Sequence, residues 1–88
     1  MKRVSGILLS EEDGEYVAVT LGEANKRFNG MLRMNATAGI ILARLEKETT
    51  EEELVQAVLA EYVVEEGRAR ENVRAVLEKL RETGLIEE

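Results

Sequence analysis

The sequence predicts a small α+β fold in which a three-stranded antiparallel sheet is followed by three helices (βββααα). Two patterns meet near residue 35: short segments punctuated by glycine come first, and apolar residues with helical spacing follow. The chain has 88 residues, so we expect one domain over residues 1–88. Three short strands cannot bury both faces of a sheet. We therefore expect the helices to pack on one side, an arrangement compatible with a winged helix-turn-helix.

The strands are predicted from a hairpin pattern and one further short run. Residues 7–10 and 15–21 are β-type runs on either side of a turn that ends in Asp13-Gly14, which is typical of a β-hairpin. In the second run, Val17, Val19 and Leu21 alternate with Tyr16, Ala18 and Thr20. Residues 30–34 are predicted to form the third strand, and residues 22–29 fit either a helical turn or a loop.

Capping residues indicate where the helices begin and end. Asn35 is placed to cap a helix over residues 36–46, and Thr50 with Glu53 forms a capping box for the next helix. The third helix is predicted over residues 66–83, before Gly84. The three apolar faces are expected to comprise Ala38, Ile41, Leu42 and Leu45; Leu54, Val55, Val58, Leu59 and Tyr62; and Ala69, Val73, Val76, Leu77 and Leu80. The apolar pair Leu85 and Ile86 is expected to fold back onto the core.

Composition excludes several classes of protein. The chain contains neither Cys nor His, which excludes zinc sites, iron–sulfur clusters, Cys nucleophiles, Ser-His-Asp triads and disulfides. The formal net charge is −6, which disfavours nucleic acid as a partner. No apolar run reaches the length of a membrane span, and the N-terminus lacks the pattern of a secretory signal. We therefore expect a cytoplasmic protein without a membrane partner.

The sequence contains no motif for catalysis or for a bound cofactor. Gly14, Gly22 and Gly30 are eight residues apart, a spacing that fits turns and not a phosphate-binding loop. The three glutamates at positions 51–53 lie at a helix N-terminus, where carboxylates are stabilised, so they predict no metal site. We expect no enzymatic activity and no cofactor of the chain's own.

The third helix carries a possible basic stripe formed by Arg70, Arg74 and Arg81. Such a stripe on an acidic protein could meet an acidic partner. It is also the only support for DNA binding, because a recognition helix needs exposed cations. Alternatively, the arginines could pair along the helix surface with Glu66, Glu71, Glu78 and Glu82.

The strand over residues 30–34 is a second candidate for binding. If this strand lies at a sheet edge, its main-chain groups are open for pairing. Edges are usually blunted by charge, which Arg33 could provide. Alternatively, the edge could receive a peptide as an added strand. The sequence does not separate these two interpretations.

An ordered set of segments resembles the PqqD family, named for its member in pyrroloquinoline quinone biosynthesis. The resemblance covers roughly residues 5–87. Its segments are 14–17 (GEYV), 28–38 (FNGMLRMNATA), 50–54 (TEEEL), 61–64 (EYVV), 68–70 (RAR), 77–80 (LEKL) and 84–86 (GLI). The chain departs from the family at Val63, where Asp is usual, at Glu65, where a short Asp cap is common, and at Gly67 in the first turn of the third helix.

The resemblance implies a non-catalytic, winged-helix-like module that recognises precursors of ribosomally made and post-translationally modified peptides. Such members bind the leader segment of a precursor and present it to a modifying enzyme, often a radical S-adenosylmethionine enzyme, to which any cofactor belongs. The leader adds as a strand beside the third strand and packs against the third helix. Carried over by position, the peptide-binding residues are Gly30, Met31, Leu32, Arg33, Met34, Arg70, Val73, Arg74 and Leu77.

Two other functions remain open at this point. The chain could dock on an enzyme as a structural or regulatory subunit without binding any leader. It could also be a winged-helix regulator that binds DNA, which its charge disfavours. An open edge strand would in addition allow a homodimer.

Overall fold

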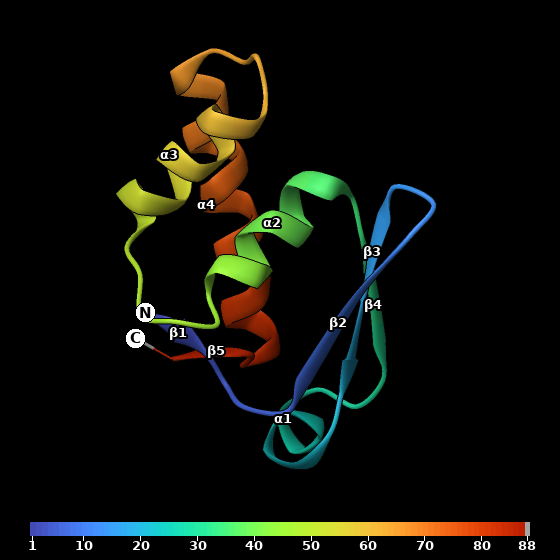
Figure 1. Ribbon diagram of the computed structural model, residues 1–88. Coiled ribbons are helices and arrows are strands. Elements are labelled where there is room, and N and C mark those ends of the chain that lie inside the picture. Colours follow the sequence, from blue (N-terminus) through green and yellow to red (C-terminus); the bar gives the residue numbers. More distant parts are fainter. Residues whose placement is uncertain (88) are drawn as a thin grey trace.

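A computed structural model describes residues 1–87, so Glu88, the last residue of the predicted domain, lies outside the described residues. Helices α2 (Ala36–Arg44), α3 (Glu51–Glu61) and α4 (Glu66–Thr83) gather on one side of a three-stranded antiparallel sheet (Figure 1). The sheet has the order β2 (Ile7–Glu12), β3 (Glu15–Thr20), β4 (Met31–Met34). The predicted fold class and the βββααα order are therefore confirmed.

The predicted hairpin is formed by β2 and β3, which pair from Ile7 with Thr20 to Glu12 with Glu15. Asp13 and Gly14 have φ values of 50° and 81°, the left-handed conformation that a two-residue type I′ turn requires. The alternation along β3 is less regular than expected, because Val17 and Ala18 are both buried while Val19 is exposed. Ala18 belongs to the helix-covered face, and Val19 therefore lies on the opposite face, which no helix covers (Figure 1).

The expected caps set the helix boundaries. The side chain of Asn35 accepts a hydrogen bond of 2.9 Å from the amide of Ala38, and Thr50 with Glu53 forms both bonds of the capping box. Gly84 ends α4 with φ 75°. Helix α2 ends at Arg44, two residues before the predicted end, and Leu45 is its C-cap.

The core lies among the three helices and the inner face of the sheet. Helix α4 contributes a fully buried stripe and packs against α2 and α3. Most of the predicted apolar faces are confirmed, but Tyr62 is an exception: it caps the C-terminus of α3 and is exposed. The largest fully buried side chains are Ile41, Leu42, Leu45, Leu54, Val55, Val58, Val73, Leu77 and Leu85.

Three short elements complete the fold. The ambiguous segment after β3 contains a helix, α1 (Gly22–Arg27). The two ends of the chain pair as β1 (Lys2–Arg3) and β5 (Ile86–Glu87), which places the termini side by side (Figure 1). Leu85 and Ile86 are buried, so the expectation that they fold back onto the core is confirmed. Among residues 1–87, no helix combines the length and the hydropathy needed to cross a bilayer.

We expect Gly39→Ala to lower the free energy of unfolding by about 1–3 kcal/mol, because it overpacks the contact between α2 and β3. A Cβ on Gly39 would lie 2.2 Å from Cγ and 2.8 Å from Cβ of Tyr16. These atoms are close to the backbone, so a rotation of the ring cannot remove the clash. Urea denaturation would measure the change.

Gly67→Ala is the matched control in another helix. A Cβ on Gly67 meets no atom within 4 Å. Alanine loses less backbone entropy than glycine on folding, so this change should raise the free energy of unfolding by about 0.5–1 kcal/mol. Equal effects of the two substitutions would contradict the close packing at Gly39.

Candidate functional site

A groove runs between the edge strand β4 and the helix α4. Strand β4 pairs with β3 on one side only, so its other edge is open. The space beside this edge has a volume of about 340 Å³. The residues that line this β4–α4 groove come from β4, from the first turn of α2 and from α4; they are Leu32, Arg33, Met34, Ala38, Ala75, Val76, Lys79 and Leu80.

The register of the sheet identifies which main-chain groups face the open edge. The amide of Thr20 donates to the carbonyl of Gly30, so these two residues form a hydrogen-bonded pair of the antiparallel ladder. Hydrogen-bonded and non-hydrogen-bonded pairs alternate along such a ladder. The pairs Val19–Met31 and Val17–Arg33 are therefore of the second kind. The N–H and C=O groups of Met31 and Arg33 consequently point away from β3, toward the open edge.

A buried hydroxyl fixes the start of β4. The Thr20 side chain is almost fully buried and donates to the carbonyls of Phe28, at 2.7 Å, and Gly30, at 3.2 Å. It also accepts hydrogen bonds from the Asn25 side chain, at 3.3 Å, and from the Gly30 amide, at 3.4 Å. Gly30 has φ 138°, a backbone conformation that residues other than glycine rarely adopt. Together these contacts determine where the open edge begins.

The walls of the β4–α4 groove are mainly carbon, with two cationic groups among the lining residues. Leu32, Met34 and Val76 are half-buried and pack against the core. Lys79 supplies a positive charge from α4, whereas Arg33 lines the groove from β4 with its side chain on the sheet face opposite Leu32 and Met34. The Arg33 guanidinium lies 4.0 Å from the Glu15 carboxylate, and both side chains are well exposed, so this ion pair constrains Arg33 only weakly.

The predicted site residues fall into two groups. The positions from Gly30 to Met34 form β4 and the residue before it, and they lie at the edge as expected. Val73 and Leu77, in contrast, are fully buried in the core and do not line the groove. Their helical stripe faces α2 and α3, and the neighbouring face of α4 borders β4. The lining residues Ala75, Val76, Lys79 and Leu80 were not among the predicted site residues, although Val76 and Leu80 were recognised as apolar.

Two arginines of the predicted basic stripe join α4 to α3. Arg70 contacts Glu52 at 2.9 Å and Glu66 at 3.1 Å, and Arg74 contacts Glu51 at 2.9 Å. The hydrogen bonds from Arg70 hold the pKa of the Glu52 carboxyl below its ordinary value, and those from Glu52 and Glu66 raise the pKa of Arg70. The interpretation in which the arginines pair along the helix surface is therefore met at Arg70, through Glu66. Arg74 pairs instead with Glu51 of α3, which the sequence did not predict. The contribution of these two residues to peptide binding stays a prediction.

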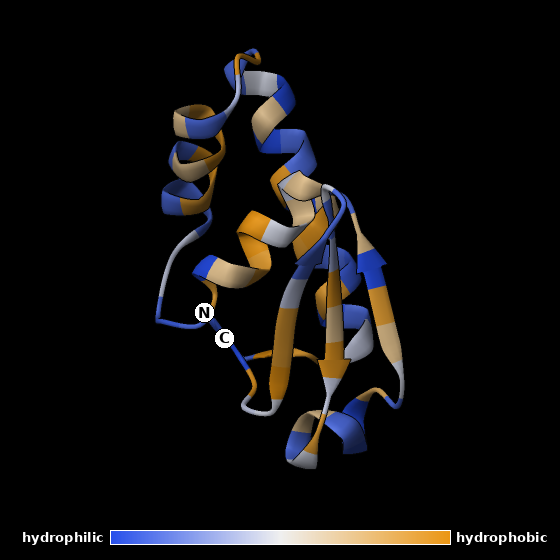
Figure 2. Ribbon diagram, turned by 45° about the vertical axis from the view of Figure 1, so that its right-hand side comes forward, coloured by the Kyte–Doolittle hydropathy of each residue, from blue (hydrophilic) through white to orange (hydrophobic). Residues whose placement is uncertain are grey.

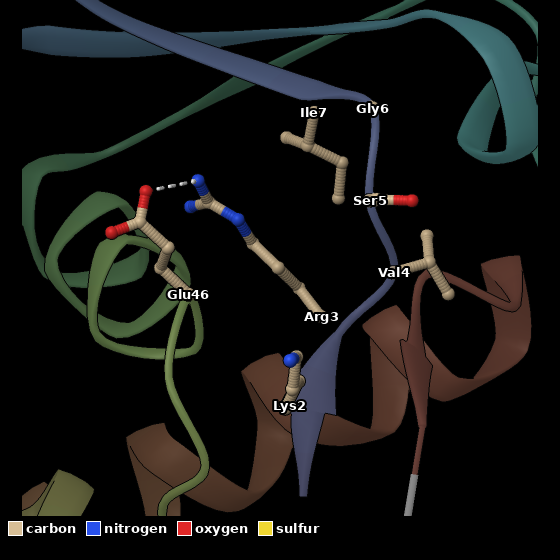
Figure 3. Close-up of a pocket in the computed structure, with 7 residues that line it drawn as sticks. All are labelled: Lys2, Arg3, Val4, Ser5, Gly6, Ile7 and Glu46. Atoms are coloured by element: carbon tan, nitrogen blue, oxygen red, sulfur yellow. Dashed lines mark ion pairs between the residues drawn. The ribbon is translucent and has the colours of Figure 1, made fainter.

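A second cavity, of about 310 Å³, lies beside the N-terminal segment (Figure 3). Its lining consists of residues 2–7 and Glu46. The Arg3 guanidinium points to Glu46, at 3.6 Å, and donates to the carbonyl of Leu42 at 2.8 Å. Because Arg3 and Glu46 already pair with each other and, of the lining residues, only Ile7 belongs to the three-stranded sheet, this cavity fits a peptide less well than the β4–α4 groove. No group of three or more acidic residues within 1–87 is placed to hold a metal ion.

Three comparisons relate the chain to known proteins. The family model described as coenzyme PQQ synthesis protein D (PqqD) matches residues 6–86. The solved structure titled "TbiB1 in Complex with the TbiA(beta) Leader Peptide" is 26% identical, with a TM-score of 0.76, over 99% of this chain and 95% of that chain. A lasso peptide synthetase B1 complexed with the leader peptide is 24% identical, with a TM-score of 0.70, over 96% of this chain and 93% of that chain. A search of curated proteins finds no significant match.

The family match covers most of the chain and includes the hairpin, the edge strand and all three helices that border or support the groove. The similarity to the two solved structures extends over the whole fold. The chain belongs to the PqqD family.

Proposed function

We propose that this protein binds the leader segment of a ribosomally made precursor peptide and presents it to a peptide-modifying enzyme. The open edge of β4 beside the apolar β4–α4 groove is the observation that carries the proposal. The two similar solved structures were determined as complexes with leader peptides, which supports it. The absence of Cys fits a compartment in which disulfides are rare, so we place this step in the cytoplasm.

The main chain of β4 would supply affinity that does not depend on the leader's sequence. A peptide aligned with β4 can pair with the open N–H and C=O groups of Met31 and Arg33. Side chains of an extended peptide alternate between two faces, so every second leader residue would enter the β4–α4 groove. That groove would select apolar side chains through Leu32 and Val76, and acidic neighbours through Lys79.

We further propose that the protein itself catalyses no reaction. The groove is lined by apolar residues together with Arg33 and Lys79. Such a lining suits the binding of a peptide, and it contains no carboxylate or hydroxyl side chain for acid–base or nucleophilic catalysis. The modifying enzyme would bring the catalyst and any cofactor. DNA binding is less well supported, because Arg70 and Arg74 are engaged by glutamates of α3 and α4.

Met31→Pro should weaken leader binding by at least about tenfold, because it removes a main-chain donor that faces the open edge and puts a ring in the path of the peptide. The ladder bonds to β3 come from the neighbouring residues, so the fold should persist. Calorimetric titration with the leader peptide encoded beside the gene would give the affinity, and the amide spectrum would report on folding.

Met31→Thr is the matched control. Threonine shortens the same side chain but keeps the N–H group and the strand propensity, so leader affinity should stay within about twofold. If Met31→Pro folds and still binds the leader as tightly as the unmodified chain, strand addition at β4 is ruled out.

Ala75→Tyr should block the groove from the helix side. Ala75 is exposed on α4 and lines the groove, so an aromatic ring there can occupy the space without overpacking the core. We expect at least about a tenfold loss of leader affinity, which corresponds to the removal of one well-packed side-chain contact.

The control for this change is Ala60→Tyr, at an exposed position of α3 outside the groove. It adds the same ring to a helix surface and should leave leader affinity unchanged. Equal affinities of the two variants would place the peptide elsewhere on the molecule.

A further inference from the structure

The face of the sheet opposite the helices carries an exposed row of apolar side chains that lies outside the β4–α4 groove. Leu8, Val19 and Met31 are 58%, 38% and 56% exposed. Leu8 pairs with Val19, and Val19 pairs with Met31, so the three residues lie side by side across β2, β3 and β4. Leu21, half exposed just past β3, is also apolar. Figure 2 shows hydrophobic residues along all three strands.

This arrangement differs from an ordinary solvated sheet face. An antiparallel sheet with one buried face usually carries polar residues on the other. Apolar residues scattered singly over a surface need no explanation, but directly paired cross-strand neighbours have Cβ atoms about 5 Å apart and form a continuous patch. We therefore take this contiguous apolar patch as a candidate for a protein–protein contact.

Acidic residues border the patch at the tip of the hairpin. Glu12 and Glu15 are paired on the same face of the sheet, and Asp13 lies in the turn between them. Glu12 follows Leu8 by four residues along β2, a distance of about 13 Å in an extended strand. The face therefore has an apolar end and an acidic end. Within residues 1–87, Arg33 is the basic residue that shares this face, and it contacts Glu15 at 4.0 Å.

The charges and the position of the patch identify its occupant. A second copy of the chain would bring another acidic hairpin tip to this face, where Arg33 is already in contact with Glu15. A partner with an apolar patch bordered by lysine or arginine would match both ends. A leader added to β4 would also extend the sheet, so a protein seated on the outer face would touch the alternate leader residues that point away from the groove.

We propose that the outer face of the sheet, through Leu8, Val19 and Met31, is the docking surface for the peptide-modifying enzyme, which contacts it with an apolar patch bordered by basic residues. This inference rests on the proposed leader-binding function. It assigns the leader and the enzyme to adjacent surfaces of the same sheet, so that delivery requires no release of the peptide.

The test uses the double variant Leu8→Thr, Val19→Thr of the full chain. Threonine keeps strand propensity, and neither position lies in the groove. Binding to the purified modifying enzyme encoded beside the gene, measured by biolayer interferometry, should weaken by at least about tenfold. Calorimetric titration with the leader should give an unchanged affinity. The matched control is Val63→Thr, because Val63 is 108% exposed and lies on the turn between α3 and α4.

A second variant tests the acidic end. Glu12→Gln with Asp13→Asn should reduce the salt dependence of enzyme binding, because exposed charges act through long-range attraction that salt screens. Glu61→Gln with Glu65→Gln removes two exposed carboxylates elsewhere and should leave the salt dependence unchanged.

The outcomes separate the two proposals. If the unmodified chain does not bind the leader, the proposed function fails. If it binds leader and enzyme and the threonine variant binds the enzyme equally well, docking at the outer face is overturned. Light scattering that shows a dimer of the unmodified chain, lost in the threonine variant, would assign the face to a second copy and also overturn the proposal.

Discussion

The rotation of α4 about its own axis, which decides which of its faces is buried, is the constraint on which the rest of the structure depends. Its stripe of Ala69, Val73, Leu77 and Leu80 is buried against α2 and α3, and burial of such side chains contributes about 1.5–3 kcal/mol each for the larger residues. Once this stripe is fixed, the adjacent side of the helix must face β4. The apolar edge residue Val76 and its neighbours then form one wall of the groove. One face of α4 thus packs in the core, and the adjacent face lines the β4–α4 groove.

The same packing explains why the sheet has open surfaces. Three helices and the two-residue strands at the chain ends all lie on or near one side of the sheet, so the other side and the β4 edge receive no cover (Figure 1). Thr20 adds the local restraint that keeps the edge extended, through hydrogen bonds to Phe28 and Gly30. An edge held in place before the ligand arrives loses less conformational entropy on binding.

Local patterns made much of the fold predictable. The Asp13-Gly14 turn, the Asn35 cap and the capping box of Thr50 each act within a few residues, so the sequence contains all that is needed to recognise them. The β1–β5 pair was not predicted, because two-residue strands depend on contacts between the chain ends. The predicted site residues Val73 and Leu77 of α4 lie in the core and not in the groove, for a related reason. Helical periodicity identifies an apolar stripe, but it does not tell which neighbouring element that stripe faces.

Electrostatics also depends on tertiary contacts that the sequence does not reveal. The chain has a net charge of −6, yet the glutamates at the start of α3 contact Arg70 and Arg74, and the groove itself is lined by Arg33 and Lys79. Lys79 therefore places a positive charge at the groove, while the hairpin tip carries Glu12, Asp13 and Glu15. Opposite charges at the two surfaces would attract an acidic leader and a basic enzyme surface to different places. This separation of charges would favour one orientation of the leader between this protein and the modifying enzyme. The net charge alone would not predict such an orientation.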